Sequence, residues 1–194
     1  PKTPYENDVF ERINRFFNTM SAYTFEGKVF VITGAGRGLG KYYSTHFASL
    51  GAKVLVNETG ADLHGEGTDP SFADEVVKEI KANGGEAVAN YDSVEFGDKI
   101  IKAAVDAFGT VDVLINNAGI LRDVSFAKMT EKDWDKIFAV HIKGTYMCSR
   151  AVWPIFREKR AGKIINTSSG AGLFGAFGQV NYSSAKIAVH GFTQ

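Results

Sequence analysis

The chain has 194 residues, of which 44% are hydrophobic and 21 are glycine, and its 22 basic side chains balance its 22 acidic ones. This length suits one sizeable domain, and the charge balance gives no bulk electrostatic reason to expect nucleic acid or an anionic membrane as a partner. No apolar run approaches the ~20 residues that cross a bilayer, residues 1–25 lack the apolar core of a signal peptide, and the histidines and single Cys148 share no metal-ligand spacing. The sequence therefore predicts a soluble intracellular protein without a metal.

The first segment predicts an amphipathic helix ahead of the main domain. Between Glu6 and Met20, apolar residues recur at helical spacing, at positions 9, 13, 16, 17 and 20. Because the sequence opens at Pro1 rather than at methionine, we interpret residues 1–24 as a linker or extension cut from a longer polypeptide.

From Phe25 onward, short runs rich in Val, Ile and Leu alternate with longer amphipathic stretches, a pattern typical of repeated βαβ units. Strands are predicted at Lys28–Thr33, Lys53–Asn57, Glu86–Tyr91, Val111–Asn116 and Lys163–Ser168. Helices are predicted at Gly38–Leu50, Ser71–Asn83, Glu95–Phe108, Thr130–Ala139 and His141–Lys159, with a last helix from Gln179. Residues 25–194 are thus expected to form an α/β domain with a Rossmann-type doubly wound parallel sheet, truncated because the chain stops inside its last helix.

A glycine-rich turn, Thr33–Gly40, follows the first predicted strand and opens the first predicted helix. Glycine leaves no side chain between the backbone and a pyrophosphate, and a helix N-terminus offers free N–H groups to an anion. The spacing is G-x-x-x-G-x-G through Gly34, Gly38 and Gly40, with Arg37 and Leu39 between them, and it does not fit a P-loop. The turn predicts a dinucleotide site; a structural turn without a ligand is the alternative.

Two charged residues give opposite indications about the cofactor. Glu58 ends the second predicted strand, where a carboxylate can accept hydrogen bonds from the adenosine ribose and repel a 2′-phosphate, which favours NAD. Arg37 could pair with that phosphate, so NADP stays possible. Glu58 could also be an ordinary charge at the end of a strand.

Three residues near the end of the chain suggest proton transfer. Tyr182 and Lys186 stand four residues apart on the last predicted helix, so they share one face, and Ser169 closes the preceding apolar run. A phenol titrates near ~10, and a fixed cation beside it favours the phenolate. Taken alone the spacing is weak evidence, because most such pairs are surface neighbours.

In combination, these features carry a family resemblance. The glycine turn, Asn116-Asn117-Ala118-Gly119, Ser169 and the pair Tyr182 and Lys186 occur in an order that resembles the short-chain dehydrogenase/reductases. Segments 89–94, 117–123, 140–144 and 177–182 look most like the dehydrogenase domains of type 2 peroxisomal multifunctional enzymes. This resemblance implies NAD-dependent oxidation of (3R)-3-hydroxyacyl-CoA to 3-ketoacyl-CoA in peroxisomal β-oxidation, by one module of a multifunctional protein. It also implies a homodimer.

The resemblance assigns roles residue by residue. Tyr182 is expected as general acid/base, Lys186 as the cation that holds the nicotinamide ribose, and Ser169 as the hydrogen-bond donor to the substrate oxygen. His141 stands where many members carry an asparagine that completes a catalytic tetrad. The remaining cofactor contacts are expected from Asp92, Ser93 and Val94 near the adenine and from Asn117, Ala118 and Gly119 between its halves.

Several alternatives stay open. Asn116 and Asn117 could be turn formers, and the apolar residues in the loop 170–178 could line an acyl pocket or cap the core. The apolar residues in Tyr146–Phe156 could form the dimer contact or face the sheet. The alternative functions are an NADPH-preferring 3-oxoacyl or hydroxysteroid reductase and a non-catalytic nucleotide-binding scaffold.

Overall fold

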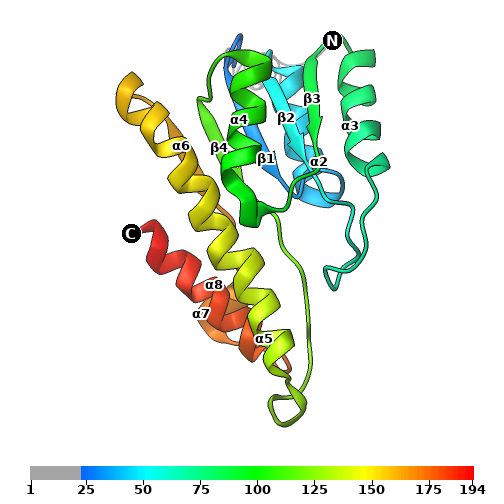
Figure 1. Cartoon of the computed structure of the whole chain (residues 1–194), viewed down its shortest axis with the longest axis vertical. Helices are drawn as coiled ribbons and strands as arrows, with labels where there is room; N and C mark the ends of the chain where they lie inside the picture. The colour runs from blue at the N-terminus through cyan, green and yellow to red at the C-terminus, as the bar shows by residue number, and fades with distance from the viewer. Residues whose placement is uncertain (1–22) are drawn as a thin grey trace, which may run out of the picture.

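A five-stranded parallel sheet forms the centre of the molecule in the computed structural model, which describes residues 23–194. The helix expected between Glu6 and Met20 therefore lies outside the described residues. The strand order is β3-β2-β1-β4-β5, which confirms the predicted doubly wound sheet (Figure 1). The strands are β1 (Val29–Thr33), β2 (Lys53–Asn57), β3 (Glu86–Asn90), β4 (Val113–Asn116) and β5 (Lys163–Asn166).

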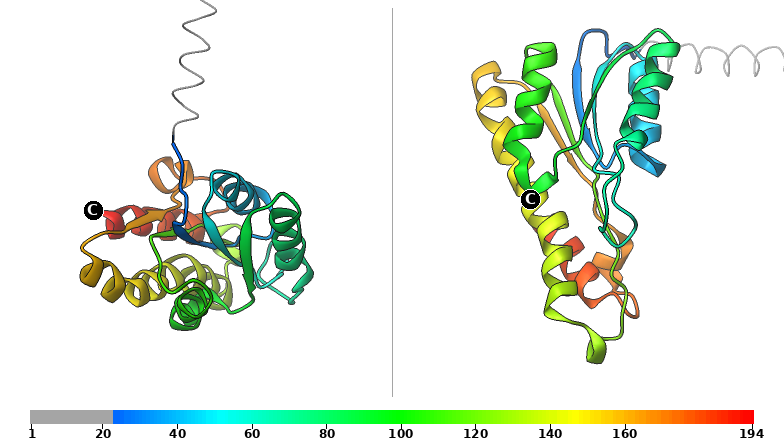
Figure 2. Two further views of the ribbon diagram at one scale, coloured as in Figure 1. Left: turned by 90° about the horizontal axis from the view of Figure 1, so that it is seen from above. Right: turned by 45° about the vertical axis from the view of Figure 1, so that its right-hand side comes forward.

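Helices cover both faces of this sheet, with α2 and α3 on one face and α4 and α6 on the other (Figure 2). The α-helices are α2 (Gly38–Ser49), α3 (Ser71–Ala82), α4 (Gly97–Phe108), α5 (Glu131–Phe138), α6 (Thr145–Lys159), α7 (Gly170–Phe174) and α8 (Val180–Thr193). Shorter turns of helix are η1 (Val94–Phe96), η2 (Phe126–Lys128) and the π-helix η3 (Ala139–Gly144).

The core divides into two apolar layers because side chains alternate along each strand. Phe30 and Ile32 of β1 pack with Val76 of α3, whereas Val31 of the same strand packs with Ile100 of α4 on the opposite face. All five residues of β1 are buried, as expected for a central strand of a parallel sheet covered on both faces. This sheet fixes the positions of the loops that leave its carboxyl edge.

The predicted break between two helices near Val140 is wrong. The chain instead continues from α5 through η3 into α6, and the π-turn absorbs the change of register without ending the helix. The Thr145 hydroxyl donates to the carbonyl of His141 at 2.7 Å, which satisfies one of the backbone groups in this turn. As a result, His141 lies inside a helix and is buried, rather than standing at a helix start.

Other differences concern the ends of elements. β4 begins and β5 ends two residues inside the predicted ranges, since their outer residues leave the sheet ladder. The segment after β5, expected to be a loop, contains the short helix α7, which Ser169 caps by accepting the Ala171 amide at 3.2 Å.

A long loop, residues 59–69, joins β2 to α3, and we name it the wall loop (the teal loop below α3 in Figure 1). Its two ends meet, because the Asp69 amide donates to the Thr59 carbonyl at 3.0 Å. Gly60 has φ +73°, and a Cβ there would collide with the backbone of Asp69. Ends in contact around a short excursion define an Ω-loop, a class that is often functional.

None of the helices between residues 23 and 194 combines the length and apolar character needed to cross a bilayer. Within the same residues, no three His, Cys, Asp or Glu side chains converge as a metal ion would require.

Candidate active site

A groove of about 720 Å³ opens at the carboxyl edge of the sheet, between the glycine turn, the wall loop and α8. This is where parallel α/β sheets bind ligands, beside the point where strand order reverses. Of the residues predicted from the sequence, the groove is lined by Gly34, Arg37, Gly38, Leu39, Glu58, Ser93, Val94, Asn117, Ala118, Gly119, His141, Tyr182 and Lys186.

The glycine turn is shaped by close packing. Gly34 has φ +61°, and a Cβ there would lie 2.7 Å from the Cα of Ala118, so the turn and the loop after β4 touch backbone to backbone. Gly40 does not line the groove; a Cβ on it would collide with the carbonyl oxygen of Gly34. Gly40 therefore serves the packing of α2 on the turn, and Gly34 serves the packing of the turn on the loop after β4.

The N-terminus of α2 is left open toward the groove. Its N-cap residue Arg37 makes no side-chain cap, and the first turn of the helix contains no acidic residue. Free N–H groups and the positive end of the helix dipole are therefore presented at the groove, an arrangement that suits a phosphate.

Glu58 and Arg37 are both engaged within the protein. The buried Glu58 carboxylate accepts the amides of Gly36 at 3.1 Å and Gly60 at 2.9 Å, so it braces the glycine turn and the wall loop together. The Arg37 guanidinium donates to the Ala61 carbonyl and lies 4.3 Å from the centroid of the Phe72 ring. Glu58 is thus more than a solvated charge at a strand end. The side chain of Arg37 is restrained by its contacts with Ala61 and Phe72.

The residues after β3 divide between lining and bracing. Ser93 and Val94 line the groove, whereas Asp92 turns toward Asn90, whose side-chain amide donates to it at 2.9 Å. The Asp92 carbonyl also accepts the Asn57 side chain at 2.8 Å, which ties this loop to β2.

The residues after β4 also combine two roles. The Asn117 side chain donates to the carbonyls of Thr33 and Gly34, each at 3.0 Å, and the segment 117–119 lines the groove. Asn116 is buried and donates to Ser149 and Asn166, which joins β4 to α6 and β5. Neither side chain bonds to the backbone of its own turn, so the turn-former interpretation fits neither residue.

Lys186 and Tyr182 lie together at the end of the groove formed by α8. The Lys186 ammonium is 5.6 Å from the centroid of the Tyr182 ring and donates to the Thr167 carbonyl at 2.6 Å. Only 4% of Lys186 is exposed. Burial disfavours its charged form and lowers the pKa of Lys186 from 10.5 to about 8. A cation fixed beneath a phenol is what the spacing of the two residues predicts.

His141 packs behind this pair. Its ring meets the Tyr182 ring edge to face at 5.2 Å, and its Nε2 lies 2.9 Å from the Ile120 carbonyl oxygen. Burial first, and the Lys186 charge second, lower the pKa of His141 from 6.5 to about 4. A Cβ on Gly119 would lie 2.8 Å from His141 Cε1, so glycine is needed for the ring to reach this position. His141 is therefore neutral and holds the loop after β4 against α8.

Ser169 is not among the residues that line the groove; its hydroxyl caps α7. Leu173, Phe174 and Phe177 are exposed by 58%, 89% and 99%, so of the two alternatives for this loop the one in which they cap the core does not hold. The remaining groove residues, above all the wall loop, Lys136 and the Thr167 carbonyl, were not predicted from the sequence. No local motif points to them, because they are brought to the site by tertiary contacts.

Comparison with known proteins decides the family. Residues 28–194 match the family described as short chain dehydrogenase. The chain belongs to this family. It is an oxidoreductase of the class that acts on CH–OH groups, and members of this short-chain dehydrogenase family use NAD or NADP.

Several of the most similar relatives are named as peroxisomal multifunctional proteins. The chain is 61% identical over 170 residues to a peroxisomal hydratase-dehydrogenase-epimerase of Neurospora crassa and 59% identical over 172 residues to the peroxisomal multifunctional enzyme A of Dictyostelium discoideum. These matches cover 88% and 89% of this chain but 19% and 39% of the relatives. The solved structure of full-length peroxisomal multifunctional enzyme type 2 from Drosophila melanogaster matches with a TM-score of 0.73 and 44% identity, over 88% of this chain and 27% of that one.

Proposed function

We propose that this chain is the dehydrogenase part of a peroxisomal multifunctional protein and oxidises (3R)-3-hydroxyacyl-CoA to 3-ketoacyl-CoA with NAD. The observation that carries the proposal is the buried Lys186 ammonium beside Tyr182 at one end of a groove whose other end is a glycine turn. A dehydrogenase role in such a protein is supported by the relative at 61% identity that is named a peroxisomal hydratase-dehydrogenase-epimerase, and the acyl-CoA substrate rests on the family resemblance.

The groove fits a nicotinamide dinucleotide. The open N-terminus of α2 and the Gly34 turn suit the pyrophosphate, and Glu58 suits a ribose hydroxyl because its carboxylate keeps acceptor capacity beyond its two backbone bonds. Ser93 and Val94 would border the adenine, with Asp92 supporting them from behind. Lys186 would hold the nicotinamide ribose at the opposite end.

The chemistry follows from where the charges lie. When bound, NAD accepts a hydride from the hydroxyl-bearing carbon of the substrate. The Tyr182 oxygen takes the hydroxyl proton as that hydride leaves, with the Lys186 ammonium fixed 5.6 Å from the centroid of the Tyr182 ring. Ser169 lies outside the groove lining and its hydroxyl accepts the Ala171 amide, which leaves the hydroxyl proton free for donation to the substrate oxygen. The His141 ring packs edge to face with the Tyr182 ring and keeps it in place.

The acyl chain has a candidate receiving surface on this molecule. Leu173, Phe174 and Phe177 project into solvent from α7 and the loop behind it, directly after Ser169 in sequence. Covering such exposed apolar side chains with an alkyl chain removes apolar surface from water and is therefore favourable. We assign them to the acyl part of the substrate, in preference to the thioester end.

The test is a turnover assay on full-length protein with NAD and each enantiomer of a 3-hydroxyacyl-CoA, read as absorbance of reduced nicotinamide. Activity with the 3R substrate is expected, and a protein that turns over neither enantiomer is not this dehydrogenase. A non-catalytic scaffold would bind NAD without any absorbance change.

The NADPH-preferring reductase is separated by exchanging the cofactor. NAD should be preferred, because a 2′-phosphate would approach the buried Glu58 carboxylate while Arg37 is occupied by Ala61 and Phe72. In Glu58→Gln, affinity for NADP should rise about tenfold relative to NAD as the repulsion is removed. A native preference for NADP would overturn this assignment.

We also propose that the exposed face of α6 pairs with a second copy of the chain. Some apolar residues of Tyr146–Phe156 face the sheet and others are free for a dimer contact. Cys148 and Val152 are buried against the sheet, whereas Tyr146 and Trp153 are 41% and 56% exposed. Trp153→Glu should convert a dimer into monomers in light scattering, and a native protein that is already monomeric would refute the pairing.

A further inference from the structure

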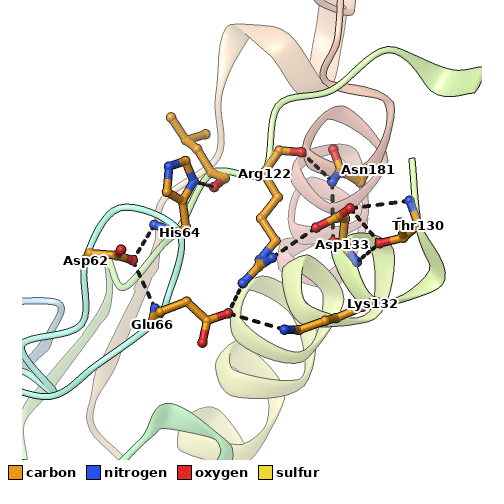
Figure 3. A network of polar contacts seen from close by, with 9 residues as sticks. Asp62, His64, Glu66, Arg122, Thr130, Lys132, Asp133 and Asn181 are labelled. Carbon is orange, nitrogen blue, oxygen red and sulfur yellow. Dashed lines mark hydrogen bonds and ion pairs between the residues drawn. The ribbon is translucent and has the colours of Figure 1, made fainter. Parts of the chain in front are cut away.

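The tip of the wall loop is fastened to the residues that follow β4. The Leu121 amide donates to the Leu63 carbonyl at 2.9 Å, and the His64 ring lies 3.0 Å from the Leu121 carbonyl (Figure 3). Asp62 shapes the tip by accepting the amides of His64 and Glu66, and these bonds lower the pKa of Asp62. The tip is thus a formed structure that closes one side of the groove.

Arg122 bridges this tip to α5. One guanidinium nitrogen donates to Glu66 of the wall loop, and the other lies 3.0 Å from the Asp133 carboxylate in the first turn of α5 (Figure 3). Asp133 is fixed in turn by a capping box with Thr130. The two carboxylates hold the pKa of Arg122 above its ordinary value, and only 12% of its side chain is exposed.

The same bridge reaches the catalytic helix through Asn181. This residue is fully buried, and its side-chain amide donates to the carbonyl of Arg122 at 3.1 Å. Its side-chain oxygen accepts the amide of Tyr182 at 2.8 Å. Arg122 therefore stands between one wall of the groove and the residue proposed to transfer the proton.

We propose that Arg122 is a positioning residue that latches the wall loop over the dinucleotide and joins this latch to the helix that carries Tyr182. The inference rests on the proposed NAD-dependent function, because the latched loop lines the groove assigned to the dinucleotide. Release of the reduced cofactor then requires the latch to open, which makes the Glu66 contact a control on the rate of release.

The two arms of the bridge differ in exposure. Glu66 is 54% exposed, whereas Asp133 is 22% exposed and held by its cap. Exposed ion pairs are weak and screened by salt, so the arm to Glu66 opens and the arm to Asp133 stays formed. A guanidinium can hold two carboxylates in one plane, which an ammonium cannot do with the same geometry.

The test compares Glu66→Gln with a matched control, Asp106→Asn, which removes a carboxylate from the exposed ion pair with Lys102 on α4. Release of NADH, followed by stopped-flow fluorescence, should be about threefold faster in Glu66→Gln and unchanged in the control. Added salt should speed release from the native protein more than from Glu66→Gln. Release rates equal to native in Glu66→Gln would overturn the latch.

Hydrogen exchange on the protein alone separates failure of the latch from failure of the proposed function. Amides of the wall loop should exchange about threefold faster in Glu66→Gln, while those of α8 stay as in the native protein. In Arg122→Lys, exchange should increase in the wall loop and in α8, because the contacts of Arg122 with Asp133 and with α8 are altered as well. Unchanged wall-loop exchange in both variants would refute the proposal even if the native enzyme is fully active.

Discussion

One end of the groove is formed mainly by backbone groups and the other by side chains. The phosphate end is backbone: the Gly34 turn and the open first turn of α2 present N–H groups with no side chain between them and a ligand. The catalytic end is made of buried polar side chains, with His141 at 2% and Lys186 at 4% exposure.

This difference shows where the cost of function lies. A binding site made of backbone N–H groups requires only that the chain adopt the necessary φ and ψ angles. The conformational strain of those angles is confined to a few residues, and glycine reduces it. Buried ionisable groups bear a desolvation cost, visible in the lowered pKa values of Lys186, about 8, and His141, about 4. The catalytic end should therefore lower the stability of the protein, and the phosphate end should not.

Lys186→Met is expected to change activity and stability in opposite directions. Turnover should fall at least about a hundredfold, since the cation beside Tyr182 is lost. The free energy of unfolding at neutral pH should nevertheless rise by roughly 2 kcal/mol, because removing the desolvation cost outweighs the lost bond to the Thr167 carbonyl. Denaturant titration and steady-state kinetics measure the two effects.

The gain in stability should depend on pH in a defined direction. The folded protein binds the Lys186 proton with a pKa of about 8 against 10.5 for ordinary lysine, so the unfolded chain holds more protons between these values. Native stability from this group therefore rises with pH across the window. The advantage of Lys186→Met should be complete below pH 8 and vanish above pH 10.5; an advantage that is constant with pH would contradict desolvation of the ammonium as its cause.

His141→Asn should remove a sensitivity to acid. The buried ring resists protonation until about pH 4, whereas an unfolded histidine takes its proton near pH 6.5. Native stability from this group is present above pH 6.5 and is lost as pH falls toward 4, by up to about 3 kcal/mol. Denaturant titrations across this range should show a flatter profile for the variant. Profiles of equal slope would mean that folding does not lower the pKa of His141.

Substitution of two glycines in the turn tests how the proposed phosphate end of the groove is built. Gly34 and Gly38 have φ +61° and +51°, but only Gly34 has a close neighbour, Ala118, whereas nothing lies within 4 Å of a Cβ on Gly38. Gly34→Ala should lower the free energy of unfolding by about 2 kcal/mol and weaken NAD binding. Gly38→Ala should cost about 1 kcal/mol, from backbone strain alone. Equal losses in calorimetry would show that packing on Ala118 is unimportant.

The same contrast explains what the sequence could predict. The glycine turn, the strands and the spacing of Tyr182 and Lys186 are local patterns, so the sheet and these parts of the groove were predictable from them. The π-helix around His141 was not, because one extra residue per turn leaves no distinct period in so short a segment. The prediction of two separate helices failed for that reason.

Long-range contacts were also beyond the sequence. Arg122 and Glu66 are 56 positions apart, and an arginine beside an aspartate in a loop reads as ordinary surface charge. The acidic residues of the wall loop likewise have no motif that indicates a groove. The role of Ser169 toward the substrate was predicted from the family resemblance, and its observed bond to Ala171 is a capping bond that the sequence did not signal.

The most direct test of the proposed mechanism is Tyr182→Phe, measured for both NADH affinity and turnover of (3R)-3-hydroxyacyl-CoA. The ring that packs on His141 is kept and only the hydroxyl is lost, so affinity should stay within about twofold of native while turnover falls about a thousandfold. Turnover that survives the loss of this hydroxyl would contradict the mechanism, because no proton acceptor would then be needed at Tyr182.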